Sequence, residues 1–232
     1  MEQFVKDCKI TSNFQNGLDV GCGAGLSTKA LRLICDRVTG TDISEQMIQV
    51  CQEEYKNDKA YTFYRAKAEE TKEPVEKYDI VTAAGMVNWV DRDLFLRNMG
   101  CVLRDQGILL IYDFWITDKM QGNDSYTNWY QNEYLKRFPK PPRNETIWKQ
   151  EELPDDFQIK NQITYELAYD FSMEQFIDFM MVQSNVNIKL ESGAVNEKNA
   201  RDWLEKSLTP VFENREKTLY FKGYNWYIYK LG

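Results

Sequence analysis

The sequence of 232 residues predicts an α/β fold in which a doubly wound, mostly parallel sheet carries helices on both faces. Short apolar runs alternate with longer segments of helical periodicity through the first half of the chain, as expected where crossover helices join parallel strands. A glycine-rich turn, Gly21–Gly25, separates the first expected strand from the first expected helix. Ile108–Tyr112 is apolar or aromatic throughout, which is typical of a strand buried on both faces.

Local patterns predict the elements of the first half in chain order. Ser44 stands where its hydroxyl can cap a helix, and apolar residues follow it at helical spacing. The expected strands are Gly17–Val20, Arg37–Thr41, Tyr61–Arg65, Tyr78–Ala83 and Ile108–Tyr112. The expected helices are Ser27–Ile34, Glu45–Lys56 and Asp91–Leu103, the last with Leu94, Phe95, Met99 and Val102 facing inward.

The alternation ends after Phe114. Residues 117–156 are polar, aromatic and proline-bearing, and we interpret them as a cap inserted into a single domain that spans residues 1–232. Further elements are expected as helices at Tyr126–Phe138, Ser172–Ser184 and Glu197–Asn214, with a break at Pro210, and as strands at Phe157–Asp170 and Thr218–Lys230. The last of these is expected as one long bent strand or as a hairpin.

Composition excludes several classes of protein. The chain has 29 basic and 36 acidic residues, and a net charge of −7 argues against a non-specific nucleic-acid binder. Histidine is absent, which excludes Ser-His and Cys-His triads, histidine metal sites and a histidine general base. Five cysteines without a C-x-x-C pair indicate a reducing, cytoplasmic location and no metal cage. Neither a membrane span nor a signal peptide is expected, because long apolar runs are missing and Met1–Gly17 is polar.

Two acidic residues bear on what the glycine turn can bind: Asp19, two residues before it, and Asp42, at the end of the next expected strand. Its G-x-G-x-G pattern allows a ligand to approach the backbone closely, while Leu26 stands where the dinucleotide fingerprint needs glycine or alanine. Asp19 would repel a pyrophosphate but attract an ammonium group. Asp42 follows Gly21 by 21 residues, at the end of the second expected strand, where a carboxylate can accept both hydroxyls of a ribose.

Five segments of the first half resemble successive motifs of class I S-adenosylmethionine-dependent methyltransferases. They are L-D-V-G-C-G-A-G at Leu18–Gly25, T-D-I-S at Thr41–Ser44, A-K-A-E-E at Ala66–Glu70, Y-D-I-V-T-A at Tyr78–Ala83 and L-R-D-Q-G-I-L-L-I at Leu103–Ile111. Each is weak alone, but they occur in the family's order and spacing across roughly Gly17–Tyr112. The resemblance is to the small-molecule group that includes trans-aconitate methyltransferases (methyltransferase type 11). It implies a Rossmann-like sheet of seven strands in the order 3-2-1-4-5-7-6, with an antiparallel last strand.

The resemblance also implies S-adenosylmethionine as the cofactor and S-adenosylhomocysteine as the product. The glycines would line the methionine and ribose, Asp42 would bind the ribose diol, and residues after the next three strands would surround the adenine and the sulfonium. The expected contacts are Asp19, Gly21, Cys22, Gly23, Gly25, Asp42, Ile43, Met47, Ala68, Glu69, Ala84 and Gly85. The alternative is an ordinary tight turn in which Asp42 caps a helix, and the ordered set of motifs disfavours it.

The acceptor site is indicated less sharply than the cofactor site. The D/N-P-P-Y/F motif of methylases that act on exocyclic amines and glutamine is absent, and Ala83–Met86 stands in its place. Met86–Asp91 resembles a segment that often reads His-Trp in small-molecule relatives, with Asn88 in place of the histidine. The candidate acceptor contacts are Met86, Trp89, Trp115, Trp129, Tyr130 and Arg143.

Two side-chain patterns near the expected cap have alternative interpretations. A helical stripe of aromatic residues would either pack the cap onto the sheet or line an acceptor pocket; it comprises Tyr126, Trp129, Tyr130 and Tyr134. A basic cluster would either be a solvated face or recognise an anion; it comprises Lys136, Arg137, Lys140, Arg143 and Lys149. Arg143 is the best candidate for a carboxylate contact, because its planar fork suits that group.

The predicted function is methyl transfer from S-adenosylmethionine to an oxygen or nitrogen of a small molecule by in-line displacement. A sulfonium methyl is already activated, so the protein mainly needs to align the acceptor and exclude water. An anionic acceptor would need no base, and the sequence assigns no catalytic residue. Two alternatives stay open: a methyltransferase acting on RNA or protein, which the net charge disfavours, and a non-catalytic module that binds the cofactor.

Two further expectations concern the whole protein. It is expected to act as a monomer or homodimer on a small-molecule acceptor. Relatives carry a longer helical segment before the first strand than Met1–Asn16. The cofactor site is therefore expected to be more open than usual, or to be completed by N-terminal sequence missing from this chain.

Overall fold

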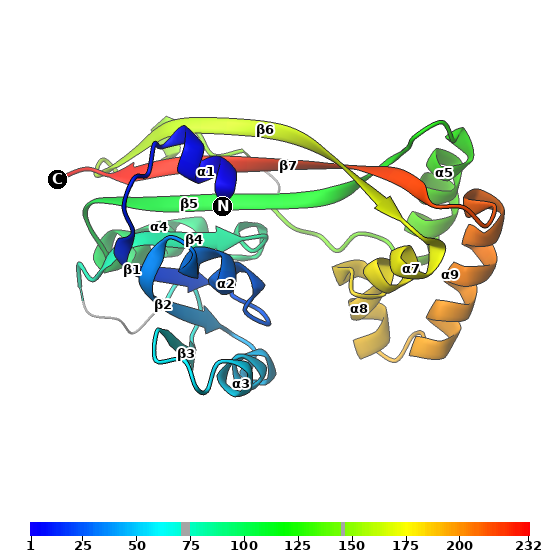
Figure 1. The fold of residues 1–232 in the computed structure, drawn as a ribbon, viewed down its shortest axis with the longest axis horizontal. Helices are drawn as coiled ribbons and strands as arrows, with labels where there is room; N and C mark the ends of the chain where they lie inside the picture. Colours follow the sequence, from blue (N-terminus) through cyan, green and yellow to red (C-terminus); the bar gives the residue numbers. More distant parts are fainter. Residues whose placement is uncertain (71–74, 145–146) are drawn as a thin grey trace. The chain divides into compact units, whose positions relative to one another are not determined.

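A computed structural model describes residues 1–70, 75–144 and 147–232. Within these ranges seven strands form one sheet in the order β3-β2-β1-β4-β5-β7-β6 (Figure 1). The strands are β1 (Phe14–Val20), β2 (Cys35–Asp42), β3 (Tyr61–Arg65), β4 (Tyr78–Ala84), β5 (Leu103–Met120), β6 (Phe157–Phe171) and β7 (Lys217–Lys230). The pairs β1–β2, β1–β4, β2–β3 and β4–β5 are parallel, whereas β7 is antiparallel. The predicted fold class and strand order are confirmed.

The chain divides into two compact units. Unit 1 comprises Met1–Asp113, Asn144–Thr164 and Tyr224–Gly232, and unit 2 comprises Phe114–Arg143 and Tyr165–Gly223. The cap expected at residues 117–156, of which 145 and 146 lie outside the described residues, therefore has different boundaries. Its second part belongs to unit 1 because Trp148 and Leu153 are buried in that unit's core. Residues 165–223 join unit 2 instead.

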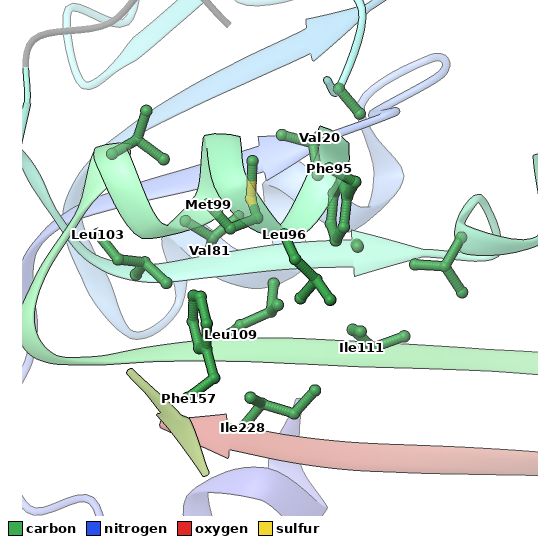
Figure 2. Packing of buried hydrophobic residues seen from close by; sticks show 14 of the residues in the cluster. Val20, Val81, Phe95, Leu96, Met99, Leu103, Leu109, Ile111, Phe157 and Ile228 are labelled. Atoms are coloured by element: carbon green, nitrogen blue, oxygen red, sulfur yellow. The ribbon is translucent and has the colours of Figure 1, made fainter. Parts of the chain in front are cut away.

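In unit 1, alternate residues of the parallel strands enter two cores on opposite faces. Val81 and Leu109 pack with Phe95 of helix α4 (Arg92–Val102) on one face (Figure 2). Ile80 and Leu110 pack on the other face in a cluster that also holds side chains of α1 (Glu2–Asp7) and α2 (Leu26–Arg32). Helix α3 (Glu45–Glu54) packs over β2 and β3. The sheet of unit 1 is thus covered on both faces, as the buried strand runs predict.

Two helices of unit 1 begin after a polar residue that caps them: Ser44, as predicted, and Asp91, which is predicted to lie inside its helix. Ser44 Oγ accepts a hydrogen bond from Met47 N at 3.4 Å, and Asp91 Oδ1 accepts one from Leu94 N at 3.0 Å. The prediction that Leu94 faces inward is wrong, because 49% of the residue is exposed. The buried face of α4 is formed instead by Phe95, Leu96, Met99 and Val102.

The later strands are longer than the sequence predicts. β5 continues from the apolar run through Met120, although its second half alternates only weakly. β7 is one strand of 14 residues, so the long-strand alternative is observed and the hairpin is not. The strand β6 matches its predicted range to within one residue at its end.

Unit 2 surrounds an aromatic core with helices. These are α5 (Asp124–Asn128), a π-helical turn η2 (Trp129–Tyr134), α6 (Leu135–Arg137), α7 (Met173–Met181), α8 (Ser184–Glu191) and α9 (Glu197–Phe212). The single helix predicted over Tyr126–Phe138 is therefore interrupted by η2, and α8 has no counterpart among the predicted elements. The predicted break at Pro210 is not observed, because α9 continues for two more residues to Phe212. The proline removes only its own N–H from the helix, since it has no N–H to donate to Lys206 O.

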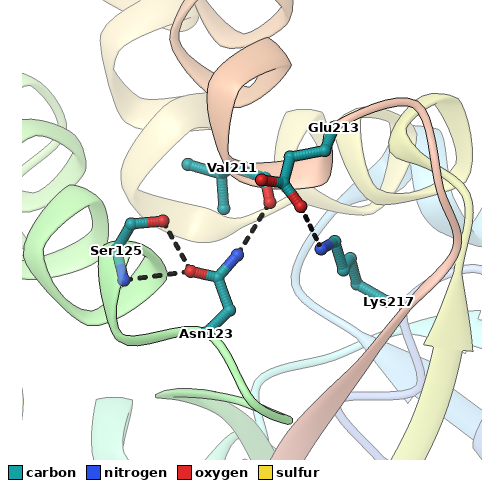
Figure 3. Close-up of polar contacts among 5 residues, drawn as sticks. All are labelled: Asn123, Ser125, Val211, Glu213 and Lys217. Carbon is teal, nitrogen blue, oxygen red and sulfur yellow. Dashed lines mark hydrogen bonds and ion pairs between the residues drawn. The ribbon is translucent and has the colours of Figure 1, made fainter.

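In unit 2, polar side chains make hydrogen bonds at the start of α5 and near the end of α9. Asn123 Oδ1 accepts a hydrogen bond from Ser125 N at 3.0 Å at the start of α5, while its Nδ2 donates to Val211 O at 2.8 Å near the end of α9 (Figure 3). Beyond that helix end, Lys217 Nζ lies 3.1 Å from Glu213 Oε2. Asn123 therefore joins two helices that are far apart in the sequence.

Two short 3₁₀ helices, η1 (Val87–Trp89) and η3 (Gln150–Glu152), complete the described elements. Across residues 1–70, 75–144 and 147–232, none of the helices combines the length and the apolar character that a bilayer crossing requires.

Candidate functional site

The turn after β1 has a backbone conformation that requires glycine. Gly21, Gly23 and Gly25 have φ angles of +68°, +51° and +88°, in the region that residues with side chains rarely adopt. The Cys22 N–H donates to Thr41 O at 2.9 Å, which holds the turn against the end of β2. Gly25 precedes the first residue of α2. The turn thus joins β1 to α2 at the carboxyl edge of the sheet.

The three glycines differ in what their missing side chains leave room for. A Cβ on Gly21 would lie 2.8 Å from Met86 Cγ, and one on Gly25 would lie 3.1 Å from Cys51 Sγ. A Cβ on Gly23 would meet nothing within 4 Å. Gly21 and Gly25 therefore serve internal packing as well as turn geometry. Gly23 is the position where the backbone faces open space and a ligand can approach.

Asp42 is held between this turn and the start of α3. Its Oδ2 accepts a hydrogen bond from Gly23 N at 2.9 Å, and its Oδ1 accepts one from Ser44 N at 2.8 Å. Each carboxylate oxygen can accept a second hydrogen bond, so the half-buried group retains capacity for two hydroxyls. Ser44 rather than Asp42 is the N-cap of α3. The carboxylate is therefore oriented beside the open face of Gly23, as a ribose-binding role requires.

Asp19 is fully buried rather than open to a ligand. Its Oδ2 accepts hydrogen bonds from Ser27 Oγ at 2.6 Å and Thr28 Oγ1 at 2.7 Å, and its Oδ1 accepts one from Thr82 Oγ1 at 2.7 Å. Burial raises the pKa of the Asp19 carboxyl, and the three hydroxyl donors act in the opposite direction. The sequence suggests direct attraction of an ammonium group. The structure instead places Asp19 where it joins β1, α2 and β4 beneath the turn.

Two thiols lie under the same turn. Cys51 Sγ is 3.3 Å and Cys22 Sγ is 3.6 Å from Gly23 O. Burial is the main cause that raises the pKa of both thiols, so they are packing groups rather than nucleophiles. Cys22 is one of the predicted cofactor contacts. Its side chain is buried with Ile48 and Phe63, which leaves its backbone as the part nearest to the open face.

The predicted adenine contacts lie beyond the ends of β2 and β3. Ile43 is 60% exposed and Met47 is half-buried on the first turn of α3. Ala68 is buried, and Glu69 Oε1 accepts a hydrogen bond from Asp91 N at 3.1 Å. Glu69 therefore connects the segment after β3 to the start of α4, and its contact with adenine stays a prediction.

The segment after β4 lies next to the glycine turn. Ala84 ends the strand, Gly85 has a φ of +65°, and Met86 packs against Gly21. A Cβ on Gly85 would also lie 3.2 Å from Asp113 Oδ1. Asp113 is not among the predicted site residues. Its position in the sequence could have indicated it, because Asp113 directly follows the apolar run of β5, the strand next to β4.

The six candidate acceptor residues are divided between the two units. Met86 and Trp89 lie in unit 1 with the glycine turn, and 49% of Trp89 is exposed. Trp115, Trp129, Tyr130 and Arg143 belong to unit 2. Trp129 and Tyr130 are only 1% and 6% exposed, and Trp129 Nε1 donates to Ser207 Oγ at 2.9 Å. For these two rings the packing interpretation is correct, because they fill the core of unit 2.

Comparison with known proteins agrees with this geometry. Residues 18–111 match the family described as a methyltransferase domain. The chain is 29% identical over 116 residues to the ubiquinone biosynthesis O-methyltransferase of Pelagibacter ubique, covering 47% of this chain and 48% of that protein. It is 32% identical over 120 residues to the ubiquinone/menaquinone biosynthesis C-methyltransferase UbiE of Escherichia coli O1:K1, covering 49% and 48%. The chain spans about half the length of the curated relatives it matches.

Solved structures show the same fold. A protein proposed as a type II methyltransferase from Anaeromyxobacter dehalogenans matches with a TM-score of 0.68 at 21% identity, over 94% of this chain and 89% of that one. The [4+2]-cyclase SpnF matches with a TM-score of 0.55 at 17% identity, over 99% and 80%. A cyclase among the matches illustrates that this fold alone does not fix the reaction.

The sheet order and the glycine turn with its two acids define a class I methyltransferase fold. Residues 18–111 resemble the type 11 methyltransferase domain, and the cofactor of this class is S-adenosylmethionine.

Proposed function

We propose that the protein transfers a methyl group from S-adenosylmethionine to an oxygen or nitrogen atom of a small molecule. The observation that carries the proposal is the pairing of Gly23 and Asp42. A glycine whose missing side chain faces open space stands 2.9 Å, from its N to Oδ2, from a carboxylate with two free acceptor positions. This arrangement fits a nucleoside that approaches the turn with its ribose hydroxyls.

The residues of unit 1 would divide the work of holding the cofactor. Asp42 would accept the ribose hydroxyls, and the backbone at Gly23 would allow the ligand to lie against the turn. Asp19 would keep the turn and α2 in place through its three hydroxyl donors. When bound, S-adenosylmethionine supplies an activated methyl group, whose bond to sulfur breaks as the bond to the acceptor forms, leaving S-adenosylhomocysteine. The protein's own task is alignment of the acceptor and exclusion of water.

The choice of a small-molecule acceptor rests on the net charge of the chain and on the relatives that resemble about half of it. A net charge of −7 opposes approach of a nucleic acid. The names of the curated relatives describe an O-methyltransferase and a C-methyltransferase, and their likeness covers about half of each chain. The acceptor atom therefore does not follow from that likeness. An anionic acceptor held by Arg143, and a monomeric or homodimeric state, stay predictions.

The test is calorimetric titration of S-adenosylhomocysteine into the purified chain and three variants. Asp42→Ala is expected to weaken binding at least tenfold, or about 1.4 kcal/mol. Gly23→Ala places a methyl group in the open space before the turn and is expected to weaken binding similarly. Gly122→Ala is the matched control, because Gly122 has a φ of +64°, a Cβ added to it would meet nothing within 4 Å, and it lies in unit 2.

Both glycine variants should lose similar thermal stability, because each forces a side chain into the left-handed region at about 1–2 kcal/mol. Only Gly23→Ala should lose affinity. Absence of binding to the unmodified chain, or equal binding by the two glycine variants, would overturn the proposed site. Tight binding without turnover of any phenol, amine or carboxylic acid in an acceptor screen would favour a non-catalytic binding module, and salt-dependent RNA binding would favour an RNA methyltransferase.

A further inference from the structure

We propose that Arg65 is a positioning residue, which holds the Asp42 carboxylate in the orientation that the ribose hydroxyls of the cofactor require. It acts through the peptide group between Ile43 and Ser44 and not by touching the ligand. This inference rests on the proposed function and deepens it, because it adds a residue to the machinery of the same site. Arg65 is the last residue of β3 and is not among the site residues that the sequence predicts.

The first support is a chain of hydrogen bonds that leads from Arg65 to the carboxylate. Arg65 Nε donates to Ile43 O at 2.9 Å. The same peptide group carries the Ser44 N–H, which donates to Asp42 Oδ1 at 2.8 Å. A peptide group is planar, so a guanidinium that holds its oxygen also fixes the direction in which its N–H points. Arg65 therefore directs this N–H at the carboxylate.

The second support is the register of β2 and β3. These strands are parallel, and the last pair of their ladder is Asp42 with Arg65. The Ala66 N–H donates to Asp42 O at 3.0 Å, so backbone bonds already join the two segments up to this point. Ile43 lies one residue beyond the last pair, and there the bond comes from the side chain of Arg65. This bond therefore orders the segment that leaves β2 and is not needed to close the sheet.

The third support is that packing gives the segment little other restraint. Ile43 is 60% exposed, so contacts of its side chain do little to fix its backbone. On the far side of the carboxylate, Asp42 Oδ2 accepts a hydrogen bond from Gly23 N at 2.9 Å. The carboxylate is thus held from two sides, by the glycine turn and by the peptide group that Arg65 holds. A group that is already in place loses little further conformational freedom when a ligand binds.

A carboxylate held in this way distinguishes ligands by their ribose hydroxyls. Hydrogen bonds from hydroxyls to an ionised carboxylate are stronger than those between neutral groups, but only where the geometry is right. Without Arg65 the peptide group can rotate, the Ser44 N–H can leave Asp42 Oδ1, and the carboxylate loses its fixed orientation. The loss should therefore fall on the contribution of the hydroxyls to binding and spare the contribution of the rest of the ligand.

The test compares S-adenosylhomocysteine with its 2′-deoxy analogue by calorimetric titration. A hydrogen bond to a charged group corresponds to about tenfold in affinity, so the unmodified chain should prefer the ribose compound by about that factor. Arg65→Met removes the guanidinium donors and keeps an apolar stem. We expect this variant to prefer the ribose compound by only about twofold or less, and to bind the 2′-deoxy analogue within about twofold of the unmodified chain.

Arg32→Met is the matched control, because Arg32 lies beside the other end of β2. Its Nη1 donates to Cys35 O at 2.8 Å, and Cys35 is the first residue of that strand. The control therefore loses the same charge and the same kind of bond to a strand carbonyl. Its preference for the ribose compound should equal that of the unmodified chain. A similar fall in both arginine variants would overturn the inference, since the effect would then follow from charge alone.

A double variant tests whether Arg65 acts through Asp42. In Asp42→Ala the contribution of the ribose hydroxyls is already lost, so adding Arg65→Met should change the affinity for S-adenosylhomocysteine by less than about twofold. A larger further loss would mean that Arg65 contacts the ligand itself or acts elsewhere, and the positioning role would then be wrong.

The outcomes separate this inference from the proposed function. If the unmodified chain does not bind S-adenosylhomocysteine, or does not distinguish it from the 2′-deoxy analogue, the proposed ribose site is wrong and the inference falls with it. If the unmodified chain prefers the ribose compound and Arg65→Met keeps that preference, the ribose site stands and Arg65 does not position it.

Discussion

Replacement of Thr82 by valine should destabilise the protein by removing one donor from the buried Asp19. Thr82 Oγ1 donates to Asp19 Oδ1 at 2.7 Å, and both side chains are fully buried. Valine keeps the shape of threonine but cannot donate. A hydrogen bond to a charged group contributes about 1.5–3 kcal/mol. The free energy of unfolding of Thr82→Val is therefore expected to fall by about that amount, measured by urea unfolding with an unchanged m-value.

Thr41→Val provides the matched control. Thr41 is also a fully buried strand residue, and its hydroxyl has no hydrogen-bond partner among the residues that the structure describes. Removing an unsatisfied buried hydroxyl should leave stability unchanged or raise it. Equal destabilisation by the two substitutions would refute the reasoning, because the loss would then follow from the valine itself and not from the bond to Asp19.

The pH dependence gives a second readout of the same contact. Burial raises the pKa of the Asp19 carboxyl above its ordinary value of 3.8, so between 3.8 and the raised value the folded state binds more protons than the unfolded state. In that window the contribution of Asp19 to stability falls as pH rises. The Thr82 bond favours the ionised form, and its loss matters most where Asp19 is charged. The penalty of Thr82→Val should therefore shrink as pH is lowered through the pKa of Asp19 in the folded state.

Two further predictions concern packing in each unit. Trp148→Ala should lower the free energy of unfolding by about 3–5 kcal/mol, since this fully buried ring contacts Phe95 and Trp226 in the core of unit 1; a loss below about 1 kcal/mol in urea unfolding would show that residues 147–156 do not belong to that core. Tyr134→Phe should cost about 1–3 kcal/mol by thermal unfolding, because Tyr134 Oη donates to the buried Asn185 Oδ1 at 3.0 Å and the amide would lose that donor. Unchanged stability of Tyr134→Phe would mean that Asn185 finds another partner.

The elements that the sequence predicts well are those fixed by local pattern. The strand Tyr61–Arg65 agrees residue for residue, and the predicted cap Ser44 precedes the first residue of its helix. These features depend on side-chain alternation and on a polar residue before an apolar run, both of which are visible in a short window. The strand order follows from the resemblance carried by five motifs.

The features that the sequence does not predict depend on distant residues. The burial of Asp19 is completed by Thr82, which is 63 residues away, and the approach of Asp113 to Gly85 depends on the register of two strands. Trp148 sits in a polar, proline-bearing segment whose composition suggests a cap, although the ring enters the core of unit 1. Composition describes a segment's average, whereas a single large ring decides where the segment packs.

The packing of Trp148 also bears on modularity. The part recognisable as a methyltransferase ends at residue 111, yet the apolar face of β5 and α4 that it presents is closed by Trp148, Phe157 and Ile228, all from later in the chain. A fragment cut at that boundary would leave Leu109 and Ile111 facing water. The segment that matches the family therefore ends at a different residue from the core into which it packs. Recombination that exchanges the recognisable part between relatives would have to carry these three closing side chains with it.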